Sequence, residues 1–237
     1  MLNTGFGINK IDAIKLLKTT IDILNEFQVN HFLISGTLLG YIRHNDFIPW
    51  DDDIDLLVDE SLLDKLYDIS KKYSNLNIFR KIENKYDCIK FCFSDGIEIS
   101  ENEKVNNWKE NSITNDNKYC WPFIDLFIYE MGPGLHRCSS ETYDESINNI
   151  KVKIFNPFNG QCSESFRFFP ESEISFFHND WHKSEFFPPK KINFLGINCN
   201  IPKNPHYFLS INYSPNYMSE IVPPSVNHKS EEKIKND

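Results

Sequence analysis

Four aspartates within five residues open a short apolar segment, in the order Asp51-Asp52-Asp53-Ile54-Asp55-Leu56-Leu57-Val58. The apolar residues predict a buried strand. Side chains alternate between the two faces of a strand, so Asp51, Asp53 and Asp55 are expected on one face and Asp52 on the other. Carboxylates that converge in this way raise one another's pKa unless a cation lies between them. The segment therefore predicts a divalent metal site, with a solvated acidic turn as the alternative.

A glycine-containing turn precedes the aspartates. Ser35-Gly36-Thr37 follows an apolar segment at 31–34 that predicts a short strand, and precedes residues 38–43, which favour a helix. Such a junction presents backbone N–H groups and a helix N-terminus to an anion. Together the two motifs predict a phosphate-binding turn beside a metal site. An ordinary turn is the alternative, and a D-x-D motif alone also fits the metal-nucleotide site of a glycosyltransferase.

The rest of the chain predicts both helices and strands. Apolar residues recur at helical spacing over residues 10–27. A capping box at 61–64 and continued apolar spacing predict a second helix that extends to Tyr73. The polar, Asn-rich residues 101–118 predict a long loop. Further predicted elements are strands at 76–80, 88–93 and 123–129, helices at 139–149 and 205–213, and a hairpin at 186–202.

Length and composition indicate one large domain. The chain has 237 residues, and 40% of them are hydrophobic, which is enough to bury a sizeable core. We expect a single domain over residues 1–222, with a core at 10–132 and an aromatic-rich lobe at 133–222. Residues 223–237 are rich in Pro, Lys and Glu and predict a flexible tail.

The charge and the apolar runs exclude several classes of protein. A net charge of -9 argues against general nucleic-acid binding, which needs a basic face. No apolar run approaches the roughly 18 residues of a membrane span, and the charged first thirty residues are unlike a signal peptide. We therefore expect a cytoplasmic protein without a nucleic-acid partner or a membrane span.

The six cysteines are scattered along the chain without a C-x-x-C pair. This distribution is typical of reduced thiols. A structural Zn2+ site built from Cys88, Cys92, Cys120, Cys138 and His136 is kept as an alternative, because thiolate and imidazole are the ligands that zinc prefers.

The segment "HFLISGTLLGYIRHNDFIPWDDDIDLLV" resembles the signature of the LicD family, a branch of the nucleotidyltransferase superfamily. The family includes bacterial phosphocholine transferases and the fukutin and fukutin-related proteins. Two later segments support the resemblance: "CWPFIDLFIYE", which carries Asp125, and "SEFFPPKKINFLGINCNIPKNPHYFLSINYSPNYM". The chain departs from the family pattern at Tyr213-Ser214, where Gly usually follows Tyr. The resemblance covers residues 10–60, 120–130 and 185–220.

The resemblance implies a nucleotidyltransferase-like α+β fold, with a mixed β-sheet flanked by helices, to which the sequence adds the aromatic-rich C-terminal lobe. It implies that Asp53 and Asp55 hold Mg2+ or Mn2+. Asp125, on a neighbouring strand, would be the third catalytic carboxylate, either as a metal ligand or as the base toward the acceptor hydroxyl. Asp51 shares their face and is expected as a secondary ligand. Asp52 is expected to face away, toward a basic residue.

The phosphates of the donor have their own predicted ligands. The backbone of Ser35, Gly36 and Thr37 would hold the leaving phosphates. Arg43 and His44 are candidate ligands of the donor phosphate, and a guanidinium suits this role because it binds phosphate through two hydrogen bonds at any pH. For His44 a surface loop histidine is the alternative.

The family's donors are nucleotide-linked alcohols or sugars, and its acceptors are glycans. We therefore expect metal-dependent transfer of a phospho-alcohol, such as phosphocholine or ribitol phosphate, from a CDP-linked donor to a glycan hydroxyl. Two metal ions would activate the acceptor and stabilise the leaving group. Two alternatives stay open: transfer of a nucleoside monophosphate with release of pyrophosphate, and a nucleotide-binding module without catalytic activity.

Overall fold

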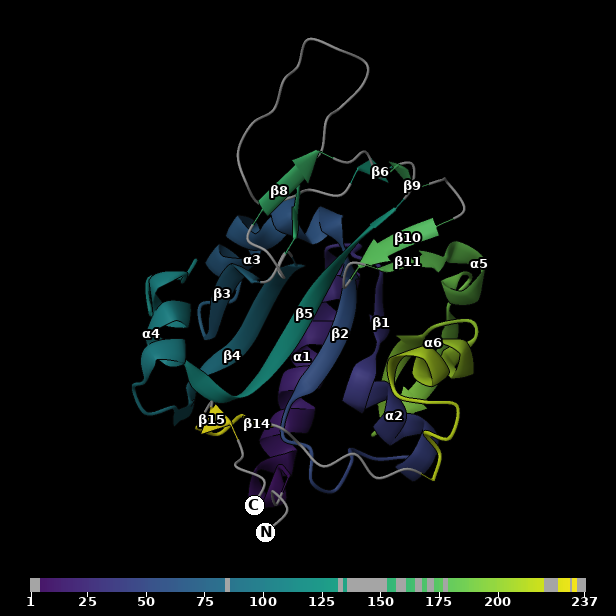
Figure 1. Cartoon of the computed structure of the whole chain (residues 1–237). Coiled ribbons are helices and arrows are strands. Elements are labelled where there is room, and N and C mark those ends of the chain that lie inside the picture. The colour runs from purple at the N-terminus through teal and green to yellow at the C-terminus, as the bar shows by residue number, and fades with distance from the viewer. Residues whose placement is uncertain are drawn as a thin grey trace.

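A mixed β-sheet forms the centre of the protein in the computed structural model (Figure 1). The structure describes residues 5–83, 86–131, 134–135, 153–156, 161–164, 168–169, 173–176, 179–219, 226–230 and 232–233. Seven strands form this sheet: β1 (His31–Leu33), β2 (Ile54–Asp59), β3 (Leu76–Glu83), β4 (Tyr86–Glu98), β5 (Cys120–Met131), β10 (Glu173–Phe176) and β11 (Asn179–His182).

The strand order places β2 and β5 side by side. β1 pairs antiparallel with β2, β2 parallel with β5, β5 antiparallel with β4, and β4 antiparallel with β3. Near its end β5 also pairs with β10, which pairs with β11. The register sets Asp55 opposite Asp125, and Asp125 opposite Lys90. Paired residues project to the same face, so these three charged side chains form a row across β2, β5 and β4.

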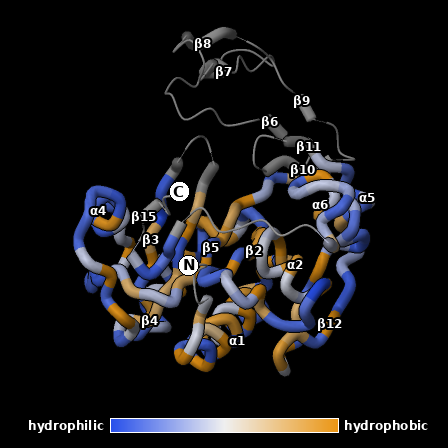
Figure 2. The backbone as a smooth tube through the Cα atoms, turned by 60° about the horizontal axis from the view of Figure 1, so that its bottom comes forward, coloured by the Kyte–Doolittle hydropathy of each residue, from blue (hydrophilic) through white to orange (hydrophobic). Residues whose placement is uncertain are grey.

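Helix α1 (Lys10–Glu26) lies against one face of the sheet and confirms the helix predicted from apolar spacing (Figure 1). Figure 2 shows that hydrophobic segments gather where α1 meets the central strands, whereas α4, at the periphery, is mostly hydrophilic. The result is a mixed α+β fold, as expected. The other helices are the 3-10 turn Gly7–Asn9, α2 (Ser35–His44), the 3-10 helix Glu60–Lys65 that runs into α3 (Leu66–Lys72), α4 (Glu103–Glu110), α5 (Lys183–Phe186) and α6 (Pro205–Asn212).

The predicted C-terminal hairpin and helix are both present. β12 (Lys190–Phe194) pairs with β13 (Ile197–Ile201) through a turn in which Gly196 has a φ of 82°, a conformation that glycine adopts without strain. Asn204 caps α6, and Pro205 occupies its first turn, where a missing N–H costs no hydrogen bond. The remaining strands form short pairs: β6 (Gly134–Leu135) with β9 (Phe168–Phe169), β7 (Lys153–Asn156) with β8 (Gln161–Glu164), and β14 (Val226–Asn227) with β15 (Glu232–Lys233).

The loop predicted over residues 101–118 is wrong in part, because it contains α4. The side chain of Asn102 caps this helix by accepting the backbone N–H of Val105 at 2.9 Å. Val105 and Trp108 are buried, and their three-residue spacing gives the helix a narrow apolar face. The Asn-rich composition concealed a short, capped helix.

Two predicted helix starts are displaced. Ser35-Gly36-Thr37 is the first turn of α2 itself and not a turn that precedes it. The second predicted helix begins as a 3-10 helix, and its cap is Asp59, whose Oδ1 accepts the N–H of Ser61 at 3.0 Å. The N-cap is therefore Asp59, two residues before the Ser61 that the predicted capping box required.

The predicted helix at 139–149 lies outside the described residues, as do the phenylalanine side chains between 155 and 169. The division into a core, a lobe and a flexible tail stays a prediction. Within the predicted tail, the structure describes residues 226–230 and 232–233.

Candidate functional site

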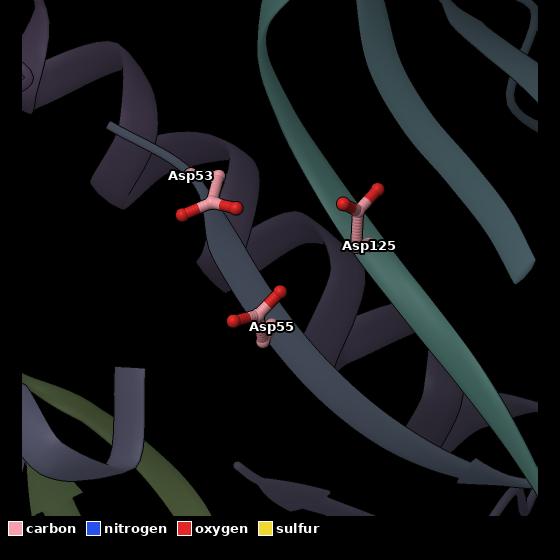
Figure 3. A group of neighbouring side chains, drawn as sticks. All are labelled: Asp53, Asp55 and Asp125. Carbon is pink, nitrogen blue, oxygen red and sulfur yellow. The ribbon is translucent and has the colours of Figure 1, made fainter. Parts of the chain in front are cut away.

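Three carboxylates converge on the face of the sheet that is turned away from α1 (Figure 3). Asp53 lies immediately before β2, Asp55 lies in β2 and Asp125 in β5. One oxygen of each carboxylate lies within 4.8 Å of the others. Asp55 and Asp125 are 9% and 8% exposed, so most of their hydration has been removed. The sequence predicted that these three residues act together, and the structure brings them together.

The first turn of α2 positions Asp55. The chain leaves β1, enters the left-handed region at Ser35 with a φ of 46°, and starts α2 at once. The hydroxyl of Thr37 then accepts the backbone N–H of Asp55 at 2.9 Å. The carbonyl of Asp55 accepts the N–H of Ile34 at 3.3 Å. The buried side chain of Thr37 therefore anchors β2 beside the helix.

Asp51 lies against the same turn. A Cβ added to Gly36 would come within 2.2 Å of Oδ2 of Asp51, so any other residue here would force this carboxylate to move. Burial raises the pKa of Asp51 well above its usual range, and Asp53 raises it further through its charge and a hydrogen bond. Asp51 is outside the group of three that converge, and its role as a secondary metal ligand stays a prediction.

Crowding also perturbs Asp55. Burial raises its pKa well above the usual range, the charges of Asp53, Asp125 and Asp51 raise it further, and Lys90 lowers it. Buried carboxylates held this close to one another are stabilised by a cation. An all-oxygen set of ligands suits Mg2+ or Mn2+, so the three residues fit the metal that the sequence predicted.

Lys90 is a site residue that the sequence analysis missed. Its ammonium group forms an ion pair with Oδ1 of Asp125, directly opposite in the neighbouring strand, and its side chain is only 5% exposed. The ammonium also lies over the ring of Phe123, 3.7 Å from the centroid. The signal in the sequence was a single lysine within the apolar segment 88–93.

His228 is the second missed residue. It lies against the site from the far end of the chain: its Nδ1 is 2.8 Å from Oδ1 of Asp52, and its Nε2 is 3.3 Å from Oδ2 of Asp53. Burial lowers the pKa of this imidazole, but the charge of Asp53 and the hydrogen bond with Asp52 outweigh burial and raise it to about 9. Asp52 is fully buried and faces a basic residue, as expected.

Two contacts hold the segment around His228 in place. The side-chain amide of Asn102 donates to the carbonyl of Ser230 at 2.8 Å. The ammonium group of Lys229 lies 4.5 Å from the ring centroid of Trp121. These contacts join Lys229 to β5 and Ser230 to the cap of α4.

Arg43 and His44 lie in the last turn of α2, whereas the phosphate-binding turn predicted at 35–37 is the first. Nε of Arg43 donates to Nε2 of His44 at 3.0 Å, and its Nη1 donates to the carbonyl of Tyr217 at 3.1 Å. Both side chains lie near the ring of Trp50. Burial lowers the pKa of His44, and the charge of Arg43 lowers it further. Their role toward a donor phosphate stays a prediction.

Tyr213 follows α6 directly, as the cap residue at its C-terminal end. Burial raises the pKa of its phenol, and the charges of Asp55, Asp51 and Asp53 raise it further. The sequence singled out this tyrosine only because Ser214 follows it where the family pattern has glycine.

The cysteines and the helices bear on the zinc alternative and on the expected absence of a membrane span. Cys88, Cys92, Cys120 and Cys199 are buried, and the last three are free thiols. Among the described residues, the group able to hold a metal ion is the three aspartates, and the zinc alternative depends on Cys138 and His136, which are outside them. None of the described helices combines the length and the apolar character needed to span a bilayer.

A mixed sheet with a helix N-terminus beside converging aspartates is the arrangement expected of a nucleotidyltransferase-like fold. A family model described as "LicD/FKTN/FKRP, nucleotidyltransferase domain" matches residues 28–204, which is more than half of the chain. The protein therefore belongs to the LicD/FKTN/FKRP family, which confirms the resemblance seen in the sequence. The matched region contains every predicted site residue.

Curated relatives match over shorter regions. The chain is 25% identical over 115 residues to the lipopolysaccharide cholinephosphotransferase LicD of Haemophilus influenzae, covering 47% of this chain and 39% of that protein. It is 30% identical over 99 residues to the uncharacterized protein RP689 of Rickettsia prowazekii, covering 41% and 37%. The alignments thus span less than two fifths of the length of these relatives.

Proposed function

We propose that this protein is a metal-dependent transferase that moves a phospho-alcohol, similar to phosphocholine or ribitol phosphate, from a CDP-linked donor to a glycan hydroxyl. The observation that carries the proposal is the buried convergence of Asp53, Asp55 and Asp125 in a member of the LicD family. The name of one relative, a lipopolysaccharide cholinephosphotransferase, supports the choice of donor and acceptor classes.

Two of the three carboxylates have a separate support. Asp53, Asp55 and Asp125 would hold Mg2+ or Mn2+, which when bound neutralises charge that develops on the transferred phosphate. Thr37 fixes the backbone of Asp55, and Lys90 holds the carboxylate of Asp125. The carboxylates are therefore placed before any ligand arrives, which is the condition for electrostatic stabilisation of a transition state.

The donor phosphates would approach the first turn of α2, where the N–H groups of Ser35, Gly36 and Thr37 face the end of the helix. The absence of a side chain at Gly36 brings the backbone close to Asp51. A phosphate at this turn would lie between the helix N-terminus and the carboxylates. Arg43 and His44 would contact a more distant part of the donor.

Thermal unfolding with a panel of ligands tests the proposal. The panel contains CTP, CMP, CDP-choline, CDP-ribitol, GDP-mannose and UDP-glucose, each with Mn2+ and with EDTA. A ligand at a hundred times its dissociation constant should stabilise the protein by about 2.7 kcal/mol. We expect cytidine compounds to stabilise the protein only with metal, and not in the Asp53→Asn variant.

Asp22→Asn is the matched control, because Asp22 is an exposed aspartate whose ion pair with Lys18 lies on α1. Stabilisation by a guanosine or uridine sugar would remove the CDP assignment and leave the metal site in place. If no nucleotide and no metal stabilises the parent protein, the proposal fails and the module without catalytic activity is favoured.

Nucleotidyl transfer is the second candidate, because the family model that matches is described as a nucleotidyltransferase domain. In that reaction the nucleoside monophosphate moves to the acceptor and pyrophosphate leaves. The two reactions use the same carboxylates, so the released product separates them and the geometry of the site does not.

A further inference from the structure

Lys90 lies in β4, at one end of the row of charged side chains that crosses the sheet. The row Asp55, Asp125 and Lys90 runs across three neighbouring strands, with each residue directly opposite the next. The ammonium group therefore lies on the same face as the carboxylates and pairs with Oδ1 of Asp125. A cation supplied by the chain is already present at the third carboxylate.

The surroundings of Lys90 keep its ammonium group in this place. The side chain is 5% exposed, so it is not extended into solvent. The rings of Phe123 and Trp108 lie 3.7 and 5.1 Å from the ammonium nitrogen, measured to their centroids. A buried ammonium separated from its carboxylate is strongly unfavourable, so departure from Asp125 would have a large cost.

Two further aspartates flank the group of three. Asp52 pairs with His228, whose Nε2 also lies 3.3 Å from Oδ2 of Asp53. Asp51 lies against the first turn of α2, outside the group of three that converge. Because Lys90 pairs with Asp125 and His228 contacts Asp53, one divalent cation between Asp53 and Asp55 would supply most of the positive charge that the site still needs.

We propose that Lys90 takes the place of a second divalent cation at Asp125, so that the site binds one divalent cation per chain, held mainly by Asp53 and Asp55. A second cation at Asp125 would meet the fixed ammonium at short range and be repelled. The inference rests on the proposed function in one respect, since it requires that the cluster binds metal. It differs from the arrangement with two metal ions that the sequence analysis allowed. Lys90 is a positioning residue that acts through Asp125.

The number of Mn2+ ions bound by the whole chain tests this inference directly. Equilibrium dialysis with elemental analysis should give one Mn2+ per chain at saturation, and the electron paramagnetic resonance spectrum should show an ion without exchange coupling to a neighbour. Lys90→Met preserves the length and the apolar part of the side chain and removes the charge. We expect this variant to bind a second Mn2+, or to bind the first at least tenfold more tightly.

Two controls accompany the variant. Lys18→Met removes an exposed lysine on α1 and should leave both the number and the affinity of Mn2+ unchanged. Lys90→Arg keeps a positive charge and should still bind one ion. If Lys90→Met does not fold, the number of Mn2+ ions bound by the parent protein decides whether the inference holds.

The outcomes separate this inference from the proposed function. Two Mn2+ ions in the parent protein would overturn the role of Lys90 and leave the metal-dependent transferase in place. One Mn2+ in Lys90→Met with unchanged affinity would also overturn it. If the parent protein binds no Mn2+, the proposed function fails first.

Discussion

The substitution Asp55→Asn tests whether repulsion among carboxylates dominates the energetics of the site. Asparagine keeps the shape of the side chain and removes its charge. The carboxylate oxygens of Asp53, Asp55 and Asp125 lie within 4.8 Å of one another. At an effective dielectric constant of about 20, each pair of charges at this distance costs about 3.5 kcal/mol. Asp51 adds a third repulsion, and Lys90 offsets part of the total because it attracts Asp55.

The metal-free Asp55→Asn variant should therefore be more stable than the parent protein by about 1–3 kcal/mol, after the burial cost of the amide. For a chain of this length the gain corresponds to a rise in Tm of about 2–12 °C. The assay is thermal unfolding in EDTA, repeated with Mn2+. We expect Mn2+ to stabilise the parent protein and to have little effect on the variant.

The raised pKa of Asp55 also makes the stability of the protein depend on pH. The pKa of Asp55 is raised in the folded protein, so the folded state keeps its proton at pH values where the unfolded state has lost it. The stability of the metal-free protein should therefore fall as the pH rises from about 4 through the folded pKa, and Asp55→Asn should lack this contribution.

Asp22→Asn is the control for stability, because Asp22 is 59% exposed and pairs with Lys18 on the surface. Its effect should be within about 0.5 kcal/mol. The reasoning is refuted if Asp55→Asn lowers the Tm in EDTA, or if Mn2+ stabilises parent and variant by the same amount.

Three further predictions concern the supports of the site. Gly36→Ala places a Cβ 2.2 Å from Oδ2 of Asp51, so isothermal titration should show Mn2+ affinity reduced by about tenfold, and unchanged affinity would contradict the packing described above. Thr37→Val removes the acceptor of the Asp55 N–H, and urea denaturation should show a loss of about 1–3 kcal/mol, whereas a loss below about 0.5 kcal/mol would contradict its anchoring role. The pKa of His228 is raised to about 9, so the stability it contributes is present below pH 6.5 and is lost as the pH rises through 9. Urea denaturation of the metal-free protein should then show about 3 kcal/mol lost between pH 6.5 and 9.5, and His228→Gln should not show this loss.

The sequence predicted the elements whose signal is local. The spacing of apolar residues placed α1, and the aspartates before an apolar segment placed β2. These patterns follow directly from helix and strand periodicity. The short helix α4 was missed because its apolar face consists of few residues, and the cap at Asn102 was not recognised among many asparagines.

The partners of the aspartates could not be predicted from the sequence, because these contacts depend on the order of the strands in the sheet. Lys90 and Asp125 are 35 residues apart, and Asp52 and His228 are 176 residues apart. Only the pairing of β4 with β5, and the return of the last segment to β5, bring them together. A lysine within an apolar strand is a usable signal, since such a residue is rarely buried without a partner. A histidine in a polar tail carries no such signal.

The released nucleotide tests the central claim most directly. The protein is incubated with CDP-choline or CDP-ribitol, a glycan acceptor and Mn2+, and the products are separated by chromatography. The account predicts CMP together with a phospho-alcohol on the acceptor, and removal of one carboxylate in Asp53→Asn should reduce the rate by at least about 100-fold. Release of pyrophosphate from a nucleoside triphosphate, or an equal rate with Asp53→Asn, would contradict it.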